Sequence, residues 1–208
     1  MGFIINAFRT GGPFMYIILI VLITGIAIMI ERIIYIMVTN RIDTAAFINR
    51  ILEFVQRDNT RSAIEFCSVS SAALPKITRA GLEEAGRSAA DIQNAFELAA
   101  MREIPKLEKR TQYLNTIANI STLLGLLGTI FGLISSFEAV ATADASMKAT
   151  LLSGGISQAM NTTAFGLIAA IPCMVGYAIL QEKTNEMVDE INENVARVYK
   201  RLVSVKGH

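Results

Sequence analysis

The stretch Leu123-Leu-Gly-Leu-Leu-Gly-Thr-Ile-Phe-Gly-Leu-Ile-Ser-Ser-Phe137 decides the fold, together with Ile156-Ser-Gln-Ala-Met-Asn-Thr-Thr-Ala-Phe-Gly-Leu-Ile-Ala-Ala-Ile-Pro172. Both runs are apolar and contain Gly, Ser, Thr or Asn, but neither contains a charged side chain. A transmembrane helix needs about 20 mostly apolar residues, and each run lies within a segment of that length. We therefore expect a membrane hairpin whose uncharged polar groups either seal the helices together or line a path.

The whole chain is too apolar for an ordinary soluble domain, because 52% of its 208 residues are hydrophobic. The predicted transmembrane helices are residues 14–38, 116–137 and 154–180, which makes this an all-α membrane protein. We expect the first to remain as an anchor, since its apolar run is too long for a signal peptide and no small-residue cleavage site follows. Cys67 falls outside these helices and Cys173 inside the third, so the two thiols should stay unpaired.

The distribution of Lys and Arg predicts the orientation of the helices. Most of these residues lie between the first two helices or after the third, whereas the N-terminal stub has only Arg9 and the last loop only Lys148. Basic segments stay on the cytoplasmic side, so the N-terminus is predicted to lie outside. The other expected segments are an outer stub at 1–13, a cytoplasmic helical domain at 39–115, an outer loop at 138–153 and a cytoplasmic C-terminal helix at 181–208.

Helical spacing dominates the predicted cytoplasmic domain. Apolar residues recur three and four positions apart, first at Phe47, Ile51, Phe54 and Val55 and then at Ala63, Ile64 and Cys67. Pro75 opens a further helix, and Gly86 marks its expected end. Ser88 and Asp91 resemble an N-cap pair for a long helix, which Pro105 should kink.

The C-terminal tail has one apolar face, formed at helical spacing by Met187, Ile191, Val195, Val198 and Leu202. Together with the third membrane helix, the tail is predicted to form one continuous rod of about 45 residues, or about 70 Å at 1.5 Å per residue. We expect that such a rod cannot bury its apolar face against its own small domain alone. It should pack on neighbouring copies, which points to an oligomer.

The chain lacks the residues that common enzyme classes need. Its only histidine is His208, and no Cys/His cluster, phosphate-binding loop or nucleophile motif is present. Glu83, Glu84 and Glu103 are expected to be solvated carboxylates on a polar helical surface rather than an acid/base pair. We therefore expect no enzymatic activity, metal or cofactor, and the interleaved positive and negative charges argue against nucleic acid as a partner.

Small residues along the second predicted membrane helix favour close helix packing. Gly125, Gly128 and Gly132 lie on one surface, and the last two form a Gly-x-x-x-Gly element. In the third helix we expect Gly166 and Pro172 to serve packing as well.

Hydroxyl and amide groups are the other unusual feature of the hairpin. Thr122, Thr129 and Ser136 recur every seven residues, but each hydroxyl can bond a carbonyl of its own helix and needs no further role. The third helix gathers polar residues that must face protein, water or the membrane interface. They are Ser157, Gln158, Asn161, Thr162 and Thr163. Neither helix has a titratable group at mid-membrane, so a partner must bring the carboxylate if protons move here.

Several runs of this sequence are also typical of one known family. They are Gly125-Leu-Leu-Gly-Thr-Ile-Phe-Gly132 and Thr163-Ala-Phe-Gly-Leu-Ile-Ala-Ala-Ile-Pro172, with Glu31-Arg32, Arg79-Ala-Gly-Leu-Glu-Glu84 and Glu103-Ile-Pro-Lys-Leu-Glu108. In these runs the chain resembles the MotA/TolQ/ExbB proton-channel family over nearly its whole length. Its size and three predicted spans are more similar to the ExbB/TolQ branch than to the four-span flagellar protein MotA.

The resemblance implies an ion-conducting subunit of a bacterial inner-membrane motor, with the N-terminus in the periplasm and the C-terminus in the cytoplasm. It implies a homopentamer around a dimer of a small single-span protein of the ExbD/TolR type, whose Asp accepts and releases H⁺ or Na⁺. Thr129 and Thr163 match family positions that line the ion route, and Thr162 is their polar neighbour. Such a complex would power envelope transport, envelope maintenance or surface motility.

One position departs from the family pattern. Gln158 stands where many ExbB and TolQ members have Glu, five residues before Thr163, and Gln cannot titrate. The alternative function is a structural membrane scaffold whose small and polar residues only lock helices together. Co-purification with a single-span protein that carries a membrane-embedded Asp would favour the motor over the scaffold.

Overall fold

The computed structural model describes residues 11–40 and 42–206 of the chain. Arg9, His208 and most of the predicted stub at 1–13 therefore lie outside the described residues. The chain forms two compact units. One consists of Arg110–Ile179 and the described part of Met1–Ile30, and the other of Glu31–Lys109 and the described part of Leu180–His208.

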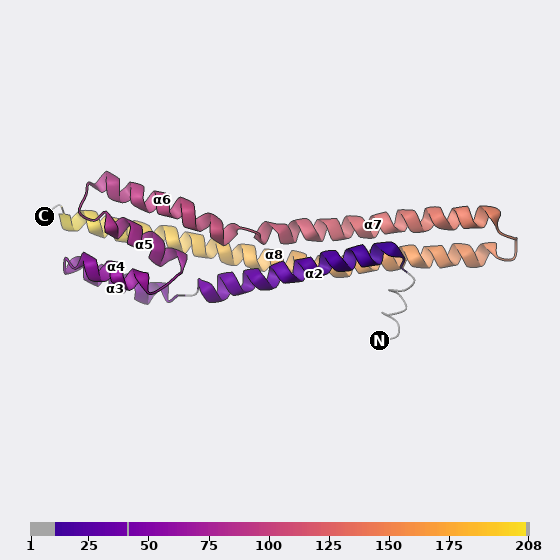
Figure 1. The fold of residues 1–208 in the computed structure, drawn as a ribbon, viewed down its shortest axis with the longest axis horizontal. Helices are drawn as coiled ribbons and strands as arrows, with labels where there is room; N and C mark the ends of the chain where they lie inside the picture. Colours follow the sequence, from indigo (N-terminus) through magenta and orange to yellow (C-terminus); the bar gives the residue numbers. More distant parts are fainter. Residues whose placement is uncertain (1–10, 41, 207–208) are drawn as a thin grey trace. The chain divides into compact units, whose positions relative to one another are not determined.

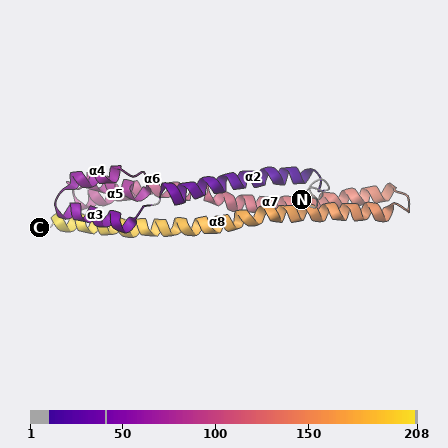
Figure 2. The same cartoon turned by 90° about the horizontal axis from the view of Figure 1, so that it is seen from below.

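Three long helices supply the first unit: α2 (Pro13–Ile34), α7 (Thr111–Thr142) and α8 (Lys148–Lys206). Each is long and apolar enough to cross a membrane, which agrees with the predicted number of spans. α7 and the first half of α8 run side by side (Figure 1 and Figure 2). α8 is one unbroken helix of 59 residues, as the predicted rod requires, and it continues into the second unit.

The second unit packs four helices against the C-terminal part of α8 (Figure 1). They are α3 (Thr44–Gln56), α4 (Thr60–Ser68), α5 (Ala73–Glu83) and α6 (Ala89–Glu108). α5 packs against both α4 and α6. The apolar faces of these helices meet in one core, whose fully buried members include Ile48, Ile51, Ile77, Ile92 and Leu107. The described part of the chain contains helices and no strand, as the apolar periodicity predicts.

The apolar face of the C-terminal tail is buried within the chain itself. Ile191, Val198 and Leu202 are 4%, 0% and 6% exposed, and the partly buried Met187 and Val195 pack on the same core. The expectation that this face needs neighbouring copies is therefore wrong. Several helices together supply its apolar contacts, and periodicity along one helix cannot show what the others supply.

Side-chain caps fix the start of α6, and a backbone break fixes its end. Ser88 and Asp91 form the predicted capping box, in which the Asp91 amide donates to Ser88 Oγ and the Ser88 amide donates to the carboxylate, both at 3.2 Å. The Ser88 hydroxyl, and then its amide, hold the pKa of Asp91 below its ordinary value. α6 passes through Pro105 and ends only at Glu108, because Arg110 then adopts a left-handed conformation with a φ of 68°.

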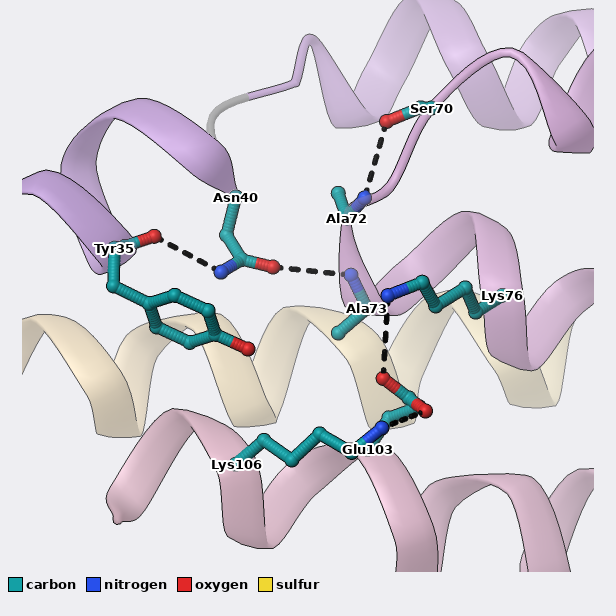
Figure 3. A network of polar contacts seen from close by, with 8 residues as sticks. All are labelled: Tyr35, Asn40, Ser70, Ala72, Ala73, Lys76, Glu103 and Lys106. Carbon is teal, nitrogen blue, oxygen red and sulfur yellow. Dashed lines mark hydrogen bonds and ion pairs between the residues drawn. The ribbon is translucent and has the colours of Figure 1, made fainter. Parts of the chain in front are cut away.

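Glu103 differs from its expectation, because it is 8% exposed rather than solvated. Its carboxylate lies 3.6 Å from the ammonium of Lys76 on α5 and also pairs with Lys106 on its own helix (Figure 3). The prediction of a solvated carboxylate is wrong at this position, since the sequence pattern of α6 does not show that α5 packs over it. Glu83 is exposed as expected and pairs with Arg79 at 2.7 Å.

Both cysteines are free and buried, and they lie in different units. This confirms the prediction that Cys67 and Cys173 do not pair. Burial raises the pKa of the Cys67 thiol to about 12, although the nearby Arg79 guanidinium acts in the opposite direction. Cys67 is therefore a protonated, unreactive thiol at neutral pH.

Candidate functional site

α7 and α8 approach each other closely at glycines. A Cβ atom added to Gly166 would lie 2.9 Å from the Gly125 Cα atom and 2.7 Å from the Ser121 carbonyl oxygen. A Cβ atom added to Gly132 would lie 3.3 Å from the Cα atom of Ala159. Small residues let two helix backbones approach in this way, so Gly166 fits at its position only because it has no side chain.

Two further glycines leave room for hydroxyl-bearing side chains. Gly128 lies against the Thr162 methyl group and Gly155 against the Ser136 hydroxyl, so that a Cβ atom on either glycine would overlap its neighbour. Pro172, by contrast, is exposed on α8. Its packing role stays a prediction, because none of the residues that the structure describes covers its side chain.

The two predicted ion-path threonines bond in different ways. Thr163, half-buried on α8, donates its hydroxyl to the Gly125 carbonyl oxygen of α7 at 3.1 Å. Thr129, half-buried on α7, donates to the Leu126 carbonyl oxygen of its own helix at 2.5 Å. Gly125 and Thr129 are four residues apart on α7, or about 6 Å along the helix axis. The structure therefore brings Thr163 to the part of α7 that lies one turn before Thr129.

Thr162 binds the segment that precedes α2 to α8. Its side chain is 1% exposed, and its hydroxyl lies 2.8 Å from the Gly11 carbonyl oxygen and 2.9 Å from the Gln158 carbonyl oxygen. One hydroxyl has a single proton, so the two acceptors share it. The Thr162 hydroxyl thus ties the chain just before α2 to α8, and it has no open face toward a path within this chain.

Gly11 and Gly12 belong to the site, although the sequence pattern predicts only a terminal stub at these positions. Gly12 has a φ of 74° and lies directly against the Gln158 amide nitrogen, so a side chain there would be both strained and obstructed. A pair of glycines followed by a proline is a turn signal, and Gly11-Gly12-Pro13 could have indicated this entry into α2.

Three other hydroxyls of the hairpin donate within their own helices. Ser121, Thr122 and Ser136 each donate to the carbonyl four residues earlier, at 2.8, 3.1 and 2.8 Å. Between 123 and 137 and between 156 and 172 the sequence contains no Asp, Glu, His, Lys or Arg. Among the described residues no group of acidic, Cys or His side chains could hold a metal ion. Neutral hydroxyls can orient a carboxylate or a water molecule, but they cannot themselves release a proton at ordinary pH.

A family model matches residues 70–193, which is more than half of the chain and includes all of α7 and α8 up to residue 193. The chain belongs to the MotA/TolQ/ExbB proton channel family. This confirms the resemblance seen in the glycine and threonine runs. Membership in this family describes a channel rather than an enzyme.

Individual members of the MotA/TolQ/ExbB family show how far the similarity extends. The chain is 27% identical over 190 residues to a putative biopolymer transport protein ExbB homolog of Methanothermobacter thermautotrophicus, covering 91% of this chain and 67% of that protein. It is 41% identical over 93 residues to the Tol-Pal system protein TolQ of Haemophilus influenzae, covering 44% of this chain and 40% of TolQ. The TolQ match therefore spans less than half of either protein.

A solved structure shares the fold. The structure of C. jejuni MotAB superimposes with a TM-score of 0.61 at 16% identity, covering 86% of this chain and 70% of the matched chain. At that identity the likeness concerns the fold alone. It agrees with the all-helical architecture and the three long apolar helices described above.

Proposed function

We propose that the protein is the ion-channel subunit of an inner-membrane complex that uses a proton or sodium gradient to drive a small single-span partner. One observation carries the proposal: two closely packed helices contain Thr129 and Thr163, but their apolar runs 123–137 and 156–172 contain no Asp, Glu, His, Lys or Arg. Membership in a proton channel family supports the same function. Because the hairpin has no carboxylate of its own, the partner would have to supply the group that binds the ion.

In this mechanism a carboxylate on the partner's membrane helix binds and releases the ion. Thr129 and Thr163 would donate hydrogen bonds to that carboxylate or to its water. When the carboxylate leaves, the two hydroxyls would again donate to their backbone carbonyl oxygens. Thr162 would act indirectly, since its hydroxyl holds the Gly11 carbonyl against α8. A membrane potential supplies about 2.3 kcal/mol per charge per 100 mV, so repeated ion passages are needed to drive a large movement.

The proposed assembly is a homopentamer around a dimer of an ExbD/TolR-like protein, with this chain's N-terminus in the periplasm and its C-terminus in the cytoplasm. The excess of Lys and Arg between the first two membrane helices and after the third supports that orientation. The names of the relatives, which refer to biopolymer transport and to the Tol-Pal system, support transport or maintenance of the cell envelope as the work performed. Surface motility is the third system that such a motor would serve.

The test compares ion flux in liposomes that contain the chain and its partner. Thr129→Val combined with Thr163→Val should preserve assembly and reduce flux at least about tenfold, because a hydrogen bond to a charged group contributes about 1.5–3 kcal/mol. Thr24→Val is the matched control, since Thr24 also lies in a membrane helix and donates to its own helix, at 2.9 Å to the Ile20 carbonyl oxygen. Normal flux in the double variant would contradict the assigned roles.

A structural scaffold is the second candidate, and one observation favours it. The hydroxyls of Thr122, Thr129, Ser136, Thr162 and Thr163 already donate to backbone carbonyls, as purely structural hydroxyls do. A scaffold requires no ion flux and no acidic residue in the partner's membrane helix. If the purified complex conducts, and replacing the partner's membrane Asp by Asn stops the flux, the scaffold is excluded.

A further inference from the structure

Two polar side chains at the C-terminal end of the first membrane helix are buried among the helices of the second unit. Arg32, in the last turn of α2, is 2% exposed. Asn40, directly after the π-helix η1 (Tyr35–Thr39), is 6% exposed. Burying an arginine is unfavourable unless its guanidinium is paired, so the contacts of these residues determine how this end of α2 is held.

Arg32 binds the C-terminal end of α6. Its Nη2 atom donates to the Leu107 carbonyl oxygen and lies 3.5 Å from the Lys106 carbonyl oxygen. α6 ends at Glu108, so both carbonyls are among the last four of the helix, which have no partner within it. A positive charge is also favourable at a helix C-terminus. Arg32 therefore caps α6 from outside, with its guanidinium 4.9 Å from the Tyr35 ring centroid.

Asn40 binds the opposite kind of helix end. Its Oδ1 atom accepts a hydrogen bond at 3.1 Å from the amide of Ala73, the first residue of α5, as Figure 3 shows. The N-cap residue of α5 is Ala72, whose side chain cannot accept a hydrogen bond. Asn40 supplies the acceptor instead, while its Nδ2 atom donates to the Tyr35 carbonyl oxygen at 3.0 Å.

The π-helix explains how one helix can serve both ends. In a regular α-helix, residues eight positions apart point about 80° away from each other around the axis. η1 lies between Arg32 and Asn40, and the bonds of a π-helix join residues five apart, so its wider turn rotates the following residue back. Arg32 and Asn40 are thereby brought toward the same face of the helix.

α5 and α6 also contact each other, so α2, α5 and α6 are connected pairwise. The two helices pack together, and the Lys76 ammonium of α5 lies 3.6 Å from the Glu103 carboxylate of α6. We propose that Arg32 and Asn40 act as a pair of remote helix caps that lock the α5–α6 hairpin to the C-terminal end of α2, so that these parts move as one body. Arg32, Asn40 and the ends of α5 and α6 that they bind all belong to the second unit, so the lock would hold the last turn of α2 within that unit. It goes beyond the proposed ion path and does not depend on it.

Hydrogen exchange on the full chain in lipid nanodiscs tests both caps. Asn40→Ala should speed exchange of the Ala73 amide by about fivefold, the usual effect of losing an N-cap. Asn59→Ala is the matched control, because Asn59 accepts a hydrogen bond at 3.2 Å from the Ser62 amide and so caps its own helix, α4. This control should change exchange in α4 and leave Ala73 unaffected. An unchanged Ala73 amide in Asn40→Ala would overturn the capping role.

The lock itself is tested by the effect of one cap on the other helix end. Arg32→Met should speed exchange in the last turn of α6 and also at Ala73, because a locked body opens together. Arg50→Met is the control, since the Arg50 guanidinium also lies 4.9 Å from an aromatic ring, that of Phe54, but caps no neighbouring helix. Effects confined to α6 would overturn the lock. If Arg32→Met does not fold, Arg32→Lys keeps the charge and should give a smaller change at the same two places, with no change overturning the proposal.

Discussion

The hydroxyl groups of the hairpin differ in which carbonyl oxygen accepts their hydrogen bond. The Thr129 hydroxyl donates within α7, so it can release that bond without moving another helix. The Thr163 hydroxyl donates across to Gly125, and the Thr162 hydroxyl reaches the Gly11 carbonyl oxygen. In the proposed mechanism, Thr129 would therefore be the residue best able to bind the partner's carboxylate, while Thr162 and Thr163 also hold segments together. Thr163→Ser should restore more function than Thr163→Val because it keeps the crossing bond.

Gly166 should be the least replaceable glycine of the hairpin. Gly166→Ala places a Cβ atom against the backbone of Ser121 and Gly125, and such overpacking destabilises by about 1–3 kcal/mol. Gly154→Ala is the matched control on the same helix, because no atom lies within 4 Å of the added Cβ, and it should stabilise by about 0.5–1 kcal/mol. Denaturant unfolding in detergent measures both. Equal stability of the two variants would show that α7 and α8 can separate at no cost.

At the scale of the element, helix ends in the second unit are satisfied by two kinds of cap. α3, α4 and α6 begin with local caps from Asp43, Asn59 and Ser88, which lie next to the helices they serve. α5 begins without one and takes its acceptor from Asn40, 33 positions earlier in the chain. A local cap stabilises one helix, whereas a remote cap also fixes the position of that helix against another.

The α6 capping box should make stability depend on acid. The pKa of Asp91 is lowered in the fold, so its carboxylate stabilises α6 at pH values above the unfolded pKa, and this contribution is lost as the pH falls through the folded pKa. Thermal unfolding from about pH 6 to about pH 3 should therefore show wild type losing stability relative to Asp91→Asn, whose side chain cannot titrate. Asp144→Asn, an exposed loop change, is the control. A pH-independent difference between wild type and Asp91→Asn would contradict this assignment.

At the scale of the whole molecule, α8 is the element that belongs to both units. Its residues up to Ile179 pair with α7, and those from Leu180 onward complete the core of the second unit. In its membrane part, α8 packs through glycine and threonine residues. In its charged C-terminal part, it packs through a stripe of apolar residues that includes Ile191, Val198 and Leu202. The stripe serves the fold of its own chain, so the proposed pentamer would have to use other surfaces.

Ile191→Ala should destabilise the second unit without changing the oligomeric state. Ile191 is 4% exposed in the core, and truncating such a side chain costs about 2–5 kcal/mol. Asn192→Ala, at the next and exposed position, should have little effect. Hydrogen exchange reports the stability of the unit, and light scattering reports the mass of the assembly. Loss of the oligomer with an intact second unit would restore the view that the stripe binds neighbouring copies.

The sequence by itself determined the features that depend on near neighbours. Three apolar runs of membrane length, the charge-free hairpin, the capping box at Ser88 and the family resemblance all follow from short-range patterns. Hydrophobic periodicity and cap chemistry act within one or two helical turns, so local reading is sufficient for them.

Only the tertiary structure decided which polar groups are buried and what they bind. Glu103 forms an ion pair with Lys76, and Arg32 and Thr162 donate hydrogen bonds to the carbonyl oxygens of Leu107 and Gly11. The partners of each contact lie far apart in the sequence. The apolar face of the C-terminal tail is covered by several helices together, and the sequence of any one of them does not show this joint contact. Burial is a property of several elements at once, whereas periodicity describes one element at a time. That is the physical reason why the three apolar helices and the family could be predicted from the sequence, whereas the contacts between distant polar residues could not.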